Sequence, residues 1–209
     1  MTAKDCGRNH HQYRKKLCRL LLASLLGFIV LALFLILLIY LILRPTKPHF
    51  ILQDATVYAF NLSAANLLTT SLQVTFSSRN PNERIGIYYD KIEAYASYHS
   101  QQITPPKLLP SSYQGHKDTT VWSSNLNGNS VPVAPYLAAA LKQDRLTGTE
   151  LINVRVEGRI RWKVGTFISG KYHLHVNCPA YVNFDSNSNG VAMGAAINYQ
   201  LIMNCHVDV

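Results

Sequence analysis

The sequence of 209 residues lacks the short motifs that mark common enzyme active sites. No Walker A motif, G-x-S-x-G, H-E-x-x-H or C-x-x-C occurs in it. Acidic residues are few, with 11 Asp and Glu against 20 Lys and Arg, and no basic region with interleaved aromatics follows the first part of the chain. We therefore expect no enzyme activity, no catalytic residue, no cofactor and no nucleic-acid partner.

Charge is absent from residues 20–43, which are almost entirely apolar. A helix of this length rises about 36 Å, and the hydrocarbon core of a bilayer is about 30 Å thick. The alternative is a cleaved signal peptide, whose apolar part is only about 7–15 residues long and is followed by small residues. Here the apolar run is longer and ends at Arg44-Pro45. The sequence predicts an uncleaved transmembrane helix over residues 20–43.

Basic residues are concentrated before this segment. The first 19 residues contain a single acid, Asp5, and six basic residues, which are Lys4, Arg8, Arg14, Lys15, Lys16 and Arg19. Only Arg44 and Lys47 follow the segment closely. Because cytoplasmic flanks carry the excess of Lys and Arg, residues 1–19 are predicted to be a cytosolic tail beside the bilayer, with the rest of the chain outside. Cys18 in this tail is either a palmitoylation site or a free thiol.

A short stalk and a β-rich domain are predicted after the membrane segment. Residues 44–49 contain two prolines and form the stalk, and residues 50–209 form the domain. The clearest strand covers residues 152–164, in which alternate positions are apolar: Ile152, Val154, Val156, Ile160, Trp162 and Val164. Such alternation is typical of a strand with one buried face. Gly158 interrupts it and is expected to mark a bulge or bend.

Six further strands and one helix complete the predicted domain. The strands are residues 50–60, 72–78, 85–98, 119–125, 172–176 and 191–207. Turns are expected at Asn80-Pro81-Asn82 and over residues 125–129. A helix should begin at Pro135 and end before Gly148. Seven strands at this spacing predict an all-β, antiparallel sandwich of the immunoglobulin-like kind with one short helix.

Two cysteines lie in the predicted domain. Cys178 shares the apolar side of its strand with Tyr172 and Leu174, and Cys205 lies on the apolar side of the last strand. Both thiols should therefore point to the interior, since strand side chains alternate in direction. They are either a disulfide, which an oxidising compartment favours, or two small core residues.

Three groups of polar residues are candidate sites. Asn61-Leu62-Ser63 is the one N-x-Ser/Thr sequon in the chain and predicts a glycan on Asn61. His173 and His175 share one strand face, but no carboxylate lies near them in the sequence, so a solvated face is favoured over a metal site.

The third group is a basic stripe on the polar side of the clearest strand, formed by Arg155, Arg159, Arg161 and Lys163. It is a candidate for docking a protein partner, an acidic polysaccharide or a lipid head group. The alternative is an ordinary solvated face. Serine at Arg155, Arg159 and Arg161 together is expected to weaken partner binding and to leave folding intact.

The sequence resembles a plant family at several places. The similar stretches are Arg44-Pro-Thr-Lys-Pro-His-Phe50, Arg79-Asn-Pro-Asn-Glu-Arg-Ile-Gly-Ile-Tyr-Tyr-Asp90, Lys163-Val-Gly-Thr-Phe167 and the strands of Cys178 and Cys205. They are similar to the harpin-induced and non-race-specific disease resistance proteins, which carry the late-embryogenesis-abundant group 2 domain. The resemblance implies a fibronectin-like β-sandwich, residence in the plasma membrane, a role in defence and stress responses, and no enzymatic activity. It supplies no ligand-contacting residues.

The function expected from these features is that of a non-enzymatic, membrane-anchored β-domain that presents its surface to a partner. Two alternatives stay open. A lipid-binding module would hold an apolar ligand between the sheets, in a cavity lined by Trp162 and Phe167. A membrane–cell-wall tether would bind acidic polysaccharide in a salt-dependent way.

Overall fold

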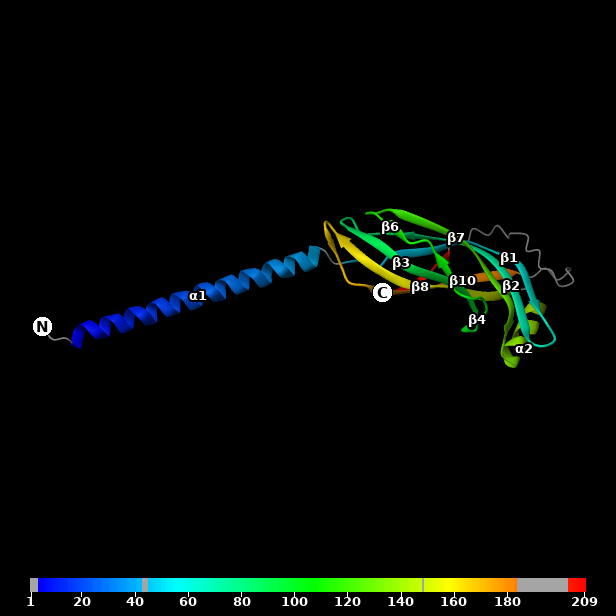
Figure 1. Ribbon diagram of the computed structural model, residues 1–209, viewed down its shortest axis with the longest axis horizontal. Helices are drawn as coiled ribbons and strands as arrows, with labels where there is room; N and C mark the ends of the chain where they lie inside the picture. The colour runs from blue at the N-terminus through cyan, green and yellow to red at the C-terminus, as the bar shows by residue number, and fades with distance from the viewer. Residues whose placement is uncertain (1–3, 43–44, 148, 184–202) are drawn as a thin grey trace. The chain divides into compact units, whose positions relative to one another are not determined.

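The computed structural model describes residues 4–42, 45–147, 149–183 and 203–209. The chain divides into two compact units, residues 1–44 and 45–209. The first is the helix α1 (Lys4–Ile42), which includes residues 20–42 of the expected membrane segment together with most of the basic tail (Figure 1). Among the described residues, the stretch Lys16–Leu38 is long and apolar enough to cross a membrane.

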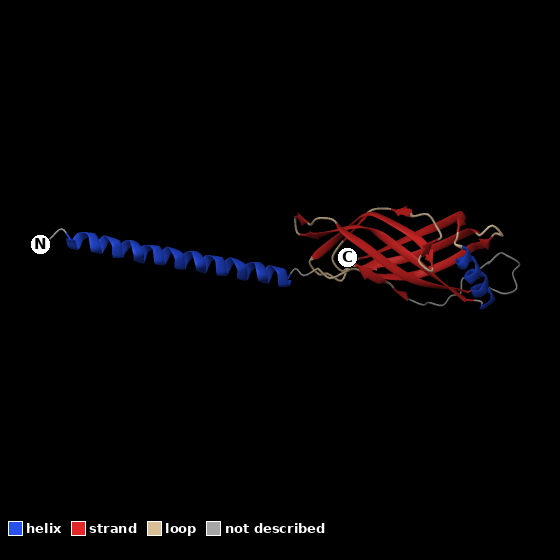
Figure 2. Cartoon of the chain, turned by 90° about the horizontal axis from the view of Figure 1, so that it is seen from below, coloured by secondary structure: helices blue, strands red, loops and turns tan. Residues whose placement is uncertain are grey.

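Strands dominate the second unit (Figure 2). Its long strands are β1 (His49–Leu62), β2 (Leu67–Arg79), β3 (Ile85–Tyr98), β7 (Thr119–Pro132), β8 (Thr149–Val164) and β10 (Tyr172–Asn183). Its short strands are β4 (Gln101–Gln102), β5 (Lys107–Leu109), β6 (Ser112–Gln114), β9 (Phe167–Ile168), β11 (Met203–Asn204) and β12 (His206–Asp208). The helix α2 (Pro135–Thr147) begins at the predicted proline.

The strands form two antiparallel sheets. One has the order β11-β1-β2-β7, and the other has the order β12-β10-β8-β3, with β4, β5 and β6 paired to β3 and β9 paired to β8. The predicted all-β, antiparallel fold is confirmed. Six of the seven expected strands correspond to the six long strands. The short strands carry too few residues for a visible alternation.

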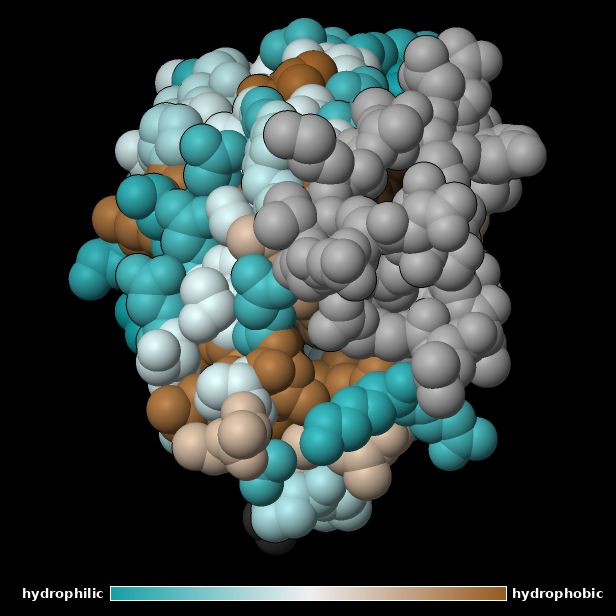
Figure 3. All heavy atoms as spheres, turned by 90° about the vertical axis from the view of Figure 1, so that its right-hand side faces the viewer, coloured by the Kyte–Doolittle hydropathy of each residue, from teal (hydrophilic) through white to brown (hydrophobic). Residues whose placement is uncertain are grey.

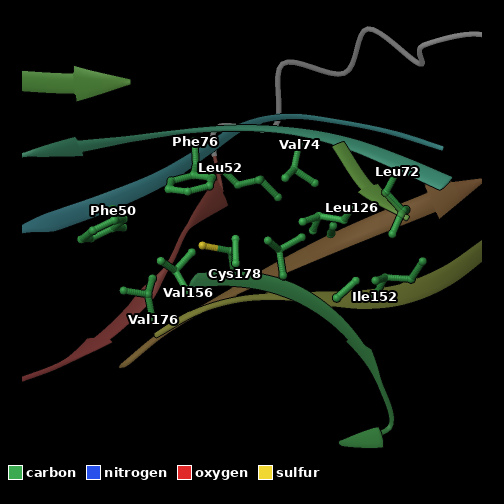
Figure 4. Packing of buried hydrophobic residues seen from close by; sticks show 14 of the residues in the cluster. Phe50, Leu52, Leu72, Val74, Phe76, Leu126, Ile152, Val156, Val176 and Cys178 are labelled. Carbon is green, nitrogen blue, oxygen red and sulfur yellow. The ribbon is translucent and has the colours of Figure 1, made fainter. Parts of the chain in front are cut away.

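The two sheets enclose a common hydrophobic core (Figure 4). The core includes four aromatic rings, from Phe50, Phe76 and Trp122 of one sheet and Tyr89 of the other, which make five ring contacts with centroids 5.2–6.3 Å apart. Each large apolar side chain buried in this way contributes roughly 1.5–3 kcal/mol. The apolar side of β8 faces the same core, because Ile152, Val154, Val156, Ile160 and Trp162 are all buried.

Gly158 of β8 lies opposite a bulge in the neighbouring strand. The register of β3 against β8 shifts between Asp90 and Glu93, and Lys91 at the bulge has a φ of 41°. A Cβ on Gly158 would lie 2.7 Å from the carbonyl oxygen of Lys91 and 2.9 Å from the Cα of Ile92. The irregularity expected at Gly158 is therefore in the partner strand, and the glycine allows that strand to come close.

Replacing Gly158 with alanine should lower the free energy of unfolding by about 1–3 kcal/mol, since the added methyl meets backbone atoms that cannot turn aside. Thermal unfolding followed by tryptophan fluorescence measures the change. Gly170→Ala is the matched control, because a Cβ at that position has nothing within 4 Å. Equal melting temperatures for the two variants would show that the close approach at Gly158 does not exist.

Two sequence predictions about the strands need correction. Residues 125–129 were expected to form a turn but lie inside β7, where Leu126 is buried and Asn127 accepts a hydrogen bond from the Ser71 hydroxyl. Asn125, Asn127 and Asn129 fit a strand here because they occupy exposed positions, and Gly128 fits because its buried position lies against the Ile103 carbonyl and leaves no room for a side chain. Of the expected strand over residues 191–207, residues 191–202 lie outside the described part of the chain. The rest divides between β11 and β12, which belong to different sheets.

Candidate functional site

The candidate site is the outer face of the sheet that contains β3, β8 and β10. The polar residues of β8 alternate with its buried ones and therefore project from this face. Register places Arg161 beside Tyr88, and places Arg159 between Asp90 on β3 and His173 on β10. The predicted basic stripe thus lies on one surface, but carboxylates and aromatic rings lie within it.

Arg161 forms an ion pair with the carboxylate of Asp90. Its Nε and a terminal nitrogen donate to the two carboxylate oxygens of Asp90, at 2.6 and 3.0 Å, in a two-pronged ion pair. The hydrogen bond to Asp90 raises the pKa of the Arg161 guanidinium. Because such a pair is geometrically specific, removal of Arg161 would leave Asp90 half-buried without its partner. The structure thus argues against including Arg161 in a substitution meant to leave folding intact.

Two tyrosines and two cations form what we call the tyrosine–cation cluster, defined as Tyr88, Tyr113, Arg161 and Lys163. The two rings have centroids 4.6 Å apart. The Arg161 guanidinium lies 5.4 Å from the Tyr88 centroid, and the Lys163 ammonium lies 5.0 Å from the Tyr113 centroid. These distances allow cation–π attraction. Since Tyr113 is 45% exposed, the cluster presents both ring surface and positive charge to solvent.

The other two members of the stripe differ from each other. Arg155 is half-buried, and its Nε has no hydrogen-bond partner. It lies opposite Tyr95, whose hydroxyl donates to Glu157 at 2.6 Å. Burial, and then Glu157, raise the pKa of Tyr95. Arg159 is exposed and makes no ion pair with another residue of the described chain, so it is the cation most available to a partner.

His173 and His175 lie side by side on β10, with ring centroids 6.4 Å apart. His175 Nδ1 is 3.9 Å from a Glu157 oxygen. Within the described residues, no group of three or more His, Cys, Asp and Glu is placed to hold a metal ion. The pair therefore belongs to the exposed polar face of β10.

A second cluster, missed from sequence, fixes the stalk to the domain. The Thr46 amide donates to Asn82 Oδ1, and Asn82 Nδ2 donates to the Thr46 carbonyl, both at 2.8 Å. Asn80, fully buried, accepts two hydrogen bonds from Asn82 and donates to the carbonyls of Ile85 and Gly115. We call Thr46, Asn80 and Asn82 the stalk clamp. The Asn-Pro-Asn motif was visible in the sequence, but its partners Thr46 and Gly115 were not.

The remaining predicted residues lie at three separate places. The structure joins Cys178 of β10 and Cys205 in a disulfide, and the Cys205 amide donates to the Phe50 carbonyl. Asn61 is exposed near the end of β1, where a glycan would project into solvent. Cys18 is an exposed free thiol in α1. Tyr172, expected to face the interior, is instead 47% exposed.

Comparison with known proteins decides the family. A family model described as late embryogenesis abundant protein matches residues 75–179, a stretch that contains the Asn-Pro-Asn turn and the whole of β8. NDR1/HIN1-like protein 1 of Arabidopsis thaliana is 54% identical over 209 residues, which are 99% of this chain and 100% of that relative. The chain belongs to the NDR1/HIN1-like family of late embryogenesis abundant proteins. The family resemblance seen in the sequence is confirmed.

Other NDR1/HIN1-like relatives also align over most of their length. NDR1/HIN1-like protein 12 of Arabidopsis thaliana is 50% identical and is covered completely, as is this chain. NDR1/HIN1-like protein 26 of the same plant is 40% identical, over 88% of this chain and 86% of that relative. Because these alignments extend beyond the β-domain, the likeness to NDR1/HIN1-like proteins includes the apolar segment near the N-terminus.

Proposed function

We propose that this NDR1/HIN1-like chain is a non-enzymatic, single-pass protein of the plasma membrane that acts in plant defence and stress responses. Its helix holds the β-domain at the bilayer, and the outer face of β3, β8 and β10 binds a protein partner. The observation that carries the proposal is the 54% identity to NDR1/HIN1-like protein 1 over the full length of both chains.

The surface of α1 supports membrane anchoring. From Leu20 to Leu38 its large apolar side chains are exposed around the whole helix. An apolar surface of this extent is unfavourable in water and is compatible with the lipid core of a bilayer. The excess of basic residues before the apolar segment supports a cytosolic N-terminus and an extracellular β-domain.

Arg159 and Lys163 are the residues of the outer face with which the partner proposal is tested. Replacing both with serine should reduce partner recovery about tenfold, equivalent to about 1.4 kcal/mol. Arg161 is retained because it neutralises Asp90. Proximity labelling from the extracellular domain in intact plant cells, followed by co-precipitation of each labelled neighbour, gives the measurement.

Lys107→Ser with Lys142→Ser is the matched control, since both lysines are exposed and lie outside this face. Partner recovery should be unchanged by the control pair. Equal partner recovery with the parent chain and both double variants would contradict binding of the partner at the outer face.

The tyrosine–cation cluster also favours the tether to the cell wall as a second function. Exposed ring faces with adjacent positive charge suit acidic sugars, whose carboxylates would pair with Lys163. Retention of the full chain on polygalacturonate at low salt, lost in the Arg159/Lys163 variant, would support the tether. The lipid-binding alternative is weaker, because Phe167 is exposed and does not line the interior.

A further inference from the structure

The hairpin between β8 and β9 carries an exposed apolar tip. Phe167 is 69% exposed and Ile168 is 41% exposed. They pair with Val164 and Lys163 across a turn in which Gly165 has a φ of 57°. Exposure of two adjacent large apolar side chains to water is unfavourable in free energy. Contact with a nearby apolar phase would remove their surface from water and stabilise this arrangement.

This tip lies at the end of the sandwich where the stalk enters. Val164 pairs with Ile85, the first residue of β3, and the Ile85 carbonyl accepts a hydrogen bond from Asn80 of the stalk clamp. The same clamp binds Thr46 through Asn82. The hairpin and the stalk are therefore parts of one end of the domain. Figure 3 views the other end, where the described residues are hydrophilic over much of the surface and a group of hydrophobic residues lies in the lower part of the view.

Few residues of the chain separate this end of the domain from α1. Four residues lead from Ile42, the last residue of α1, to Thr46. Even when fully extended, four residues span only about 14 Å. The length of the chain from Ile42 to Thr46 is limited to about that value by covalent geometry alone. The polar layer of a bilayer is itself several ångströms thick, so the stalk end of the domain is within reach of lipid head groups.

Charge at the stalk end favours the same contact. Basic residues near the stalk, the turns and the hairpin outnumber acidic ones: Lys47, Arg79, Arg84, Lys117, Lys163 and Lys171 against Glu83, Asp118 and Asp208. Two of these acids are paired, Glu83 with Lys117 and Asp208 with Lys47. Cations around exposed aromatic and aliphatic side chains are typical of surfaces that lie in the polar layer of a membrane.

We propose that the Phe167 hairpin inserts through the phosphate-bearing head-group layer of the bilayer that holds α1, as far as the outer part of the acyl chains, and that it fixes the stalk end of the β-domain against that bilayer. The inference rests on the proposed membrane anchoring. It also narrows the choice of partner: Lys163 of the tyrosine–cation cluster pairs with Ile168, so this part of the outer face lies near the lipid surface. A partner that binds there must itself lie along the membrane.

The test uses the full chain in nanodiscs of phosphatidylcholine and phosphatidylglycerol, with and without bromine on the lipid acyl chains. Phe167→Trp adds a fluorophore at the tip, while the native Trp122 and Trp162 are buried, and their signal is measured on the parent chain and subtracted. Tyr136→Trp is the control, because Tyr136 is 71% exposed in α2, next to the opposite end of β8. The added tryptophan at position 167 should lose roughly half of its intensity to brominated lipid, and that at position 136 should lose little.

Equal quenching at positions 167 and 136 would overturn the proposal. Ile168→Trp provides a second probe of the same tip, in case the first substitution alters the hairpin. Failure of the chain to co-purify with nanodiscs would instead contradict the anchoring by α1, and the inference would fall with it. Co-purification without quenching at either tip position would contradict the hairpin contact alone.

Discussion

Replacing Asn80 with alanine should lower the free energy of unfolding of the β-domain by about 4 kcal/mol. The side chain is fully buried and takes part in four hydrogen bonds. Its loss leaves the carbonyls of Ile85 and Gly115 and two donors of Asn82 without that partner. Each buried polar group left unsatisfied costs about 1–3 kcal/mol, and partial relaxation keeps the total near the lower end.

Thermal unfolding of the full chain in detergent micelles, followed by the fluorescence of Trp122 and Trp162, measures this effect. For a domain of this size the melting temperature should fall by about 12 °C. Asn127→Ala is the matched control, because Asn127 makes an exposed hydrogen bond with Ser71 and its loss should cost less than about 0.5 kcal/mol. Equal melting temperatures for Asn80→Ala and Asn127→Ala would contradict the stabilising role of the stalk clamp.

Removing the disulfide should have an effect of similar size. The bond closes a loop with a sequence separation of 27 residues. Loop-closure entropy then predicts a loss of about 3.5 kcal/mol when Cys178 and Cys205 are both changed to alanine. The melting temperature should fall by about 10 °C. The bond also ties β10 to the segment that crosses from β11 in one sheet to β12 in the other, so its loss should loosen the end of the chain first.

Reduction provides an independent measurement of the same bond. Added reductant should lower the melting temperature of the parent chain to that of the double alanine variant and should leave the variant unchanged. Cys18→Ala is the control, since Cys18 is an exposed free thiol in α1. A parent chain that melts at the same temperature with and without reductant would contradict the stabilising role of the disulfide.

Local patterns in the sequence were sufficient for most of the fold. The alternation of β8 and the proline at the start of α2 depend on neighbours along the chain, and the structure agrees with both. The bulge opposite Gly158 could not be placed, because a bulge depends on how two strands approach each other. The turn predicted over residues 125–129 was wrong, because residue type alone favours a turn there, whereas pairing with β2 makes the stretch part of β7.

The sequence predicted which face carries the candidate site, but not the ion pairs and ring contacts that its residues make. Alternation placed Arg155, Arg159 and Arg161 on one face, as the structure shows. Their different environments depend on cross-strand partners: Asp90 lies 71 residues from Arg161 in the sequence, and Tyr88 and Tyr113 come from other strands. Similarly, Thr46 and Asn82 meet only because β1 and β2 pair in one register. Contacts of this kind follow from the complete fold.

The central claim is that α1 spans the plasma membrane with its basic end in the cytosol and the β-domain outside. Epitope tags at the two ends of the chain, stained with antibody in sealed plant protoplasts, test it most directly. We predict that the C-terminal tag is stained on intact cells and that the N-terminal tag is stained only after permeabilisation. Staining of the N-terminal tag alone on intact cells would contradict the claim, and with it the extracellular partner, the glycan on Asn61 and the oxidising environment of the disulfide.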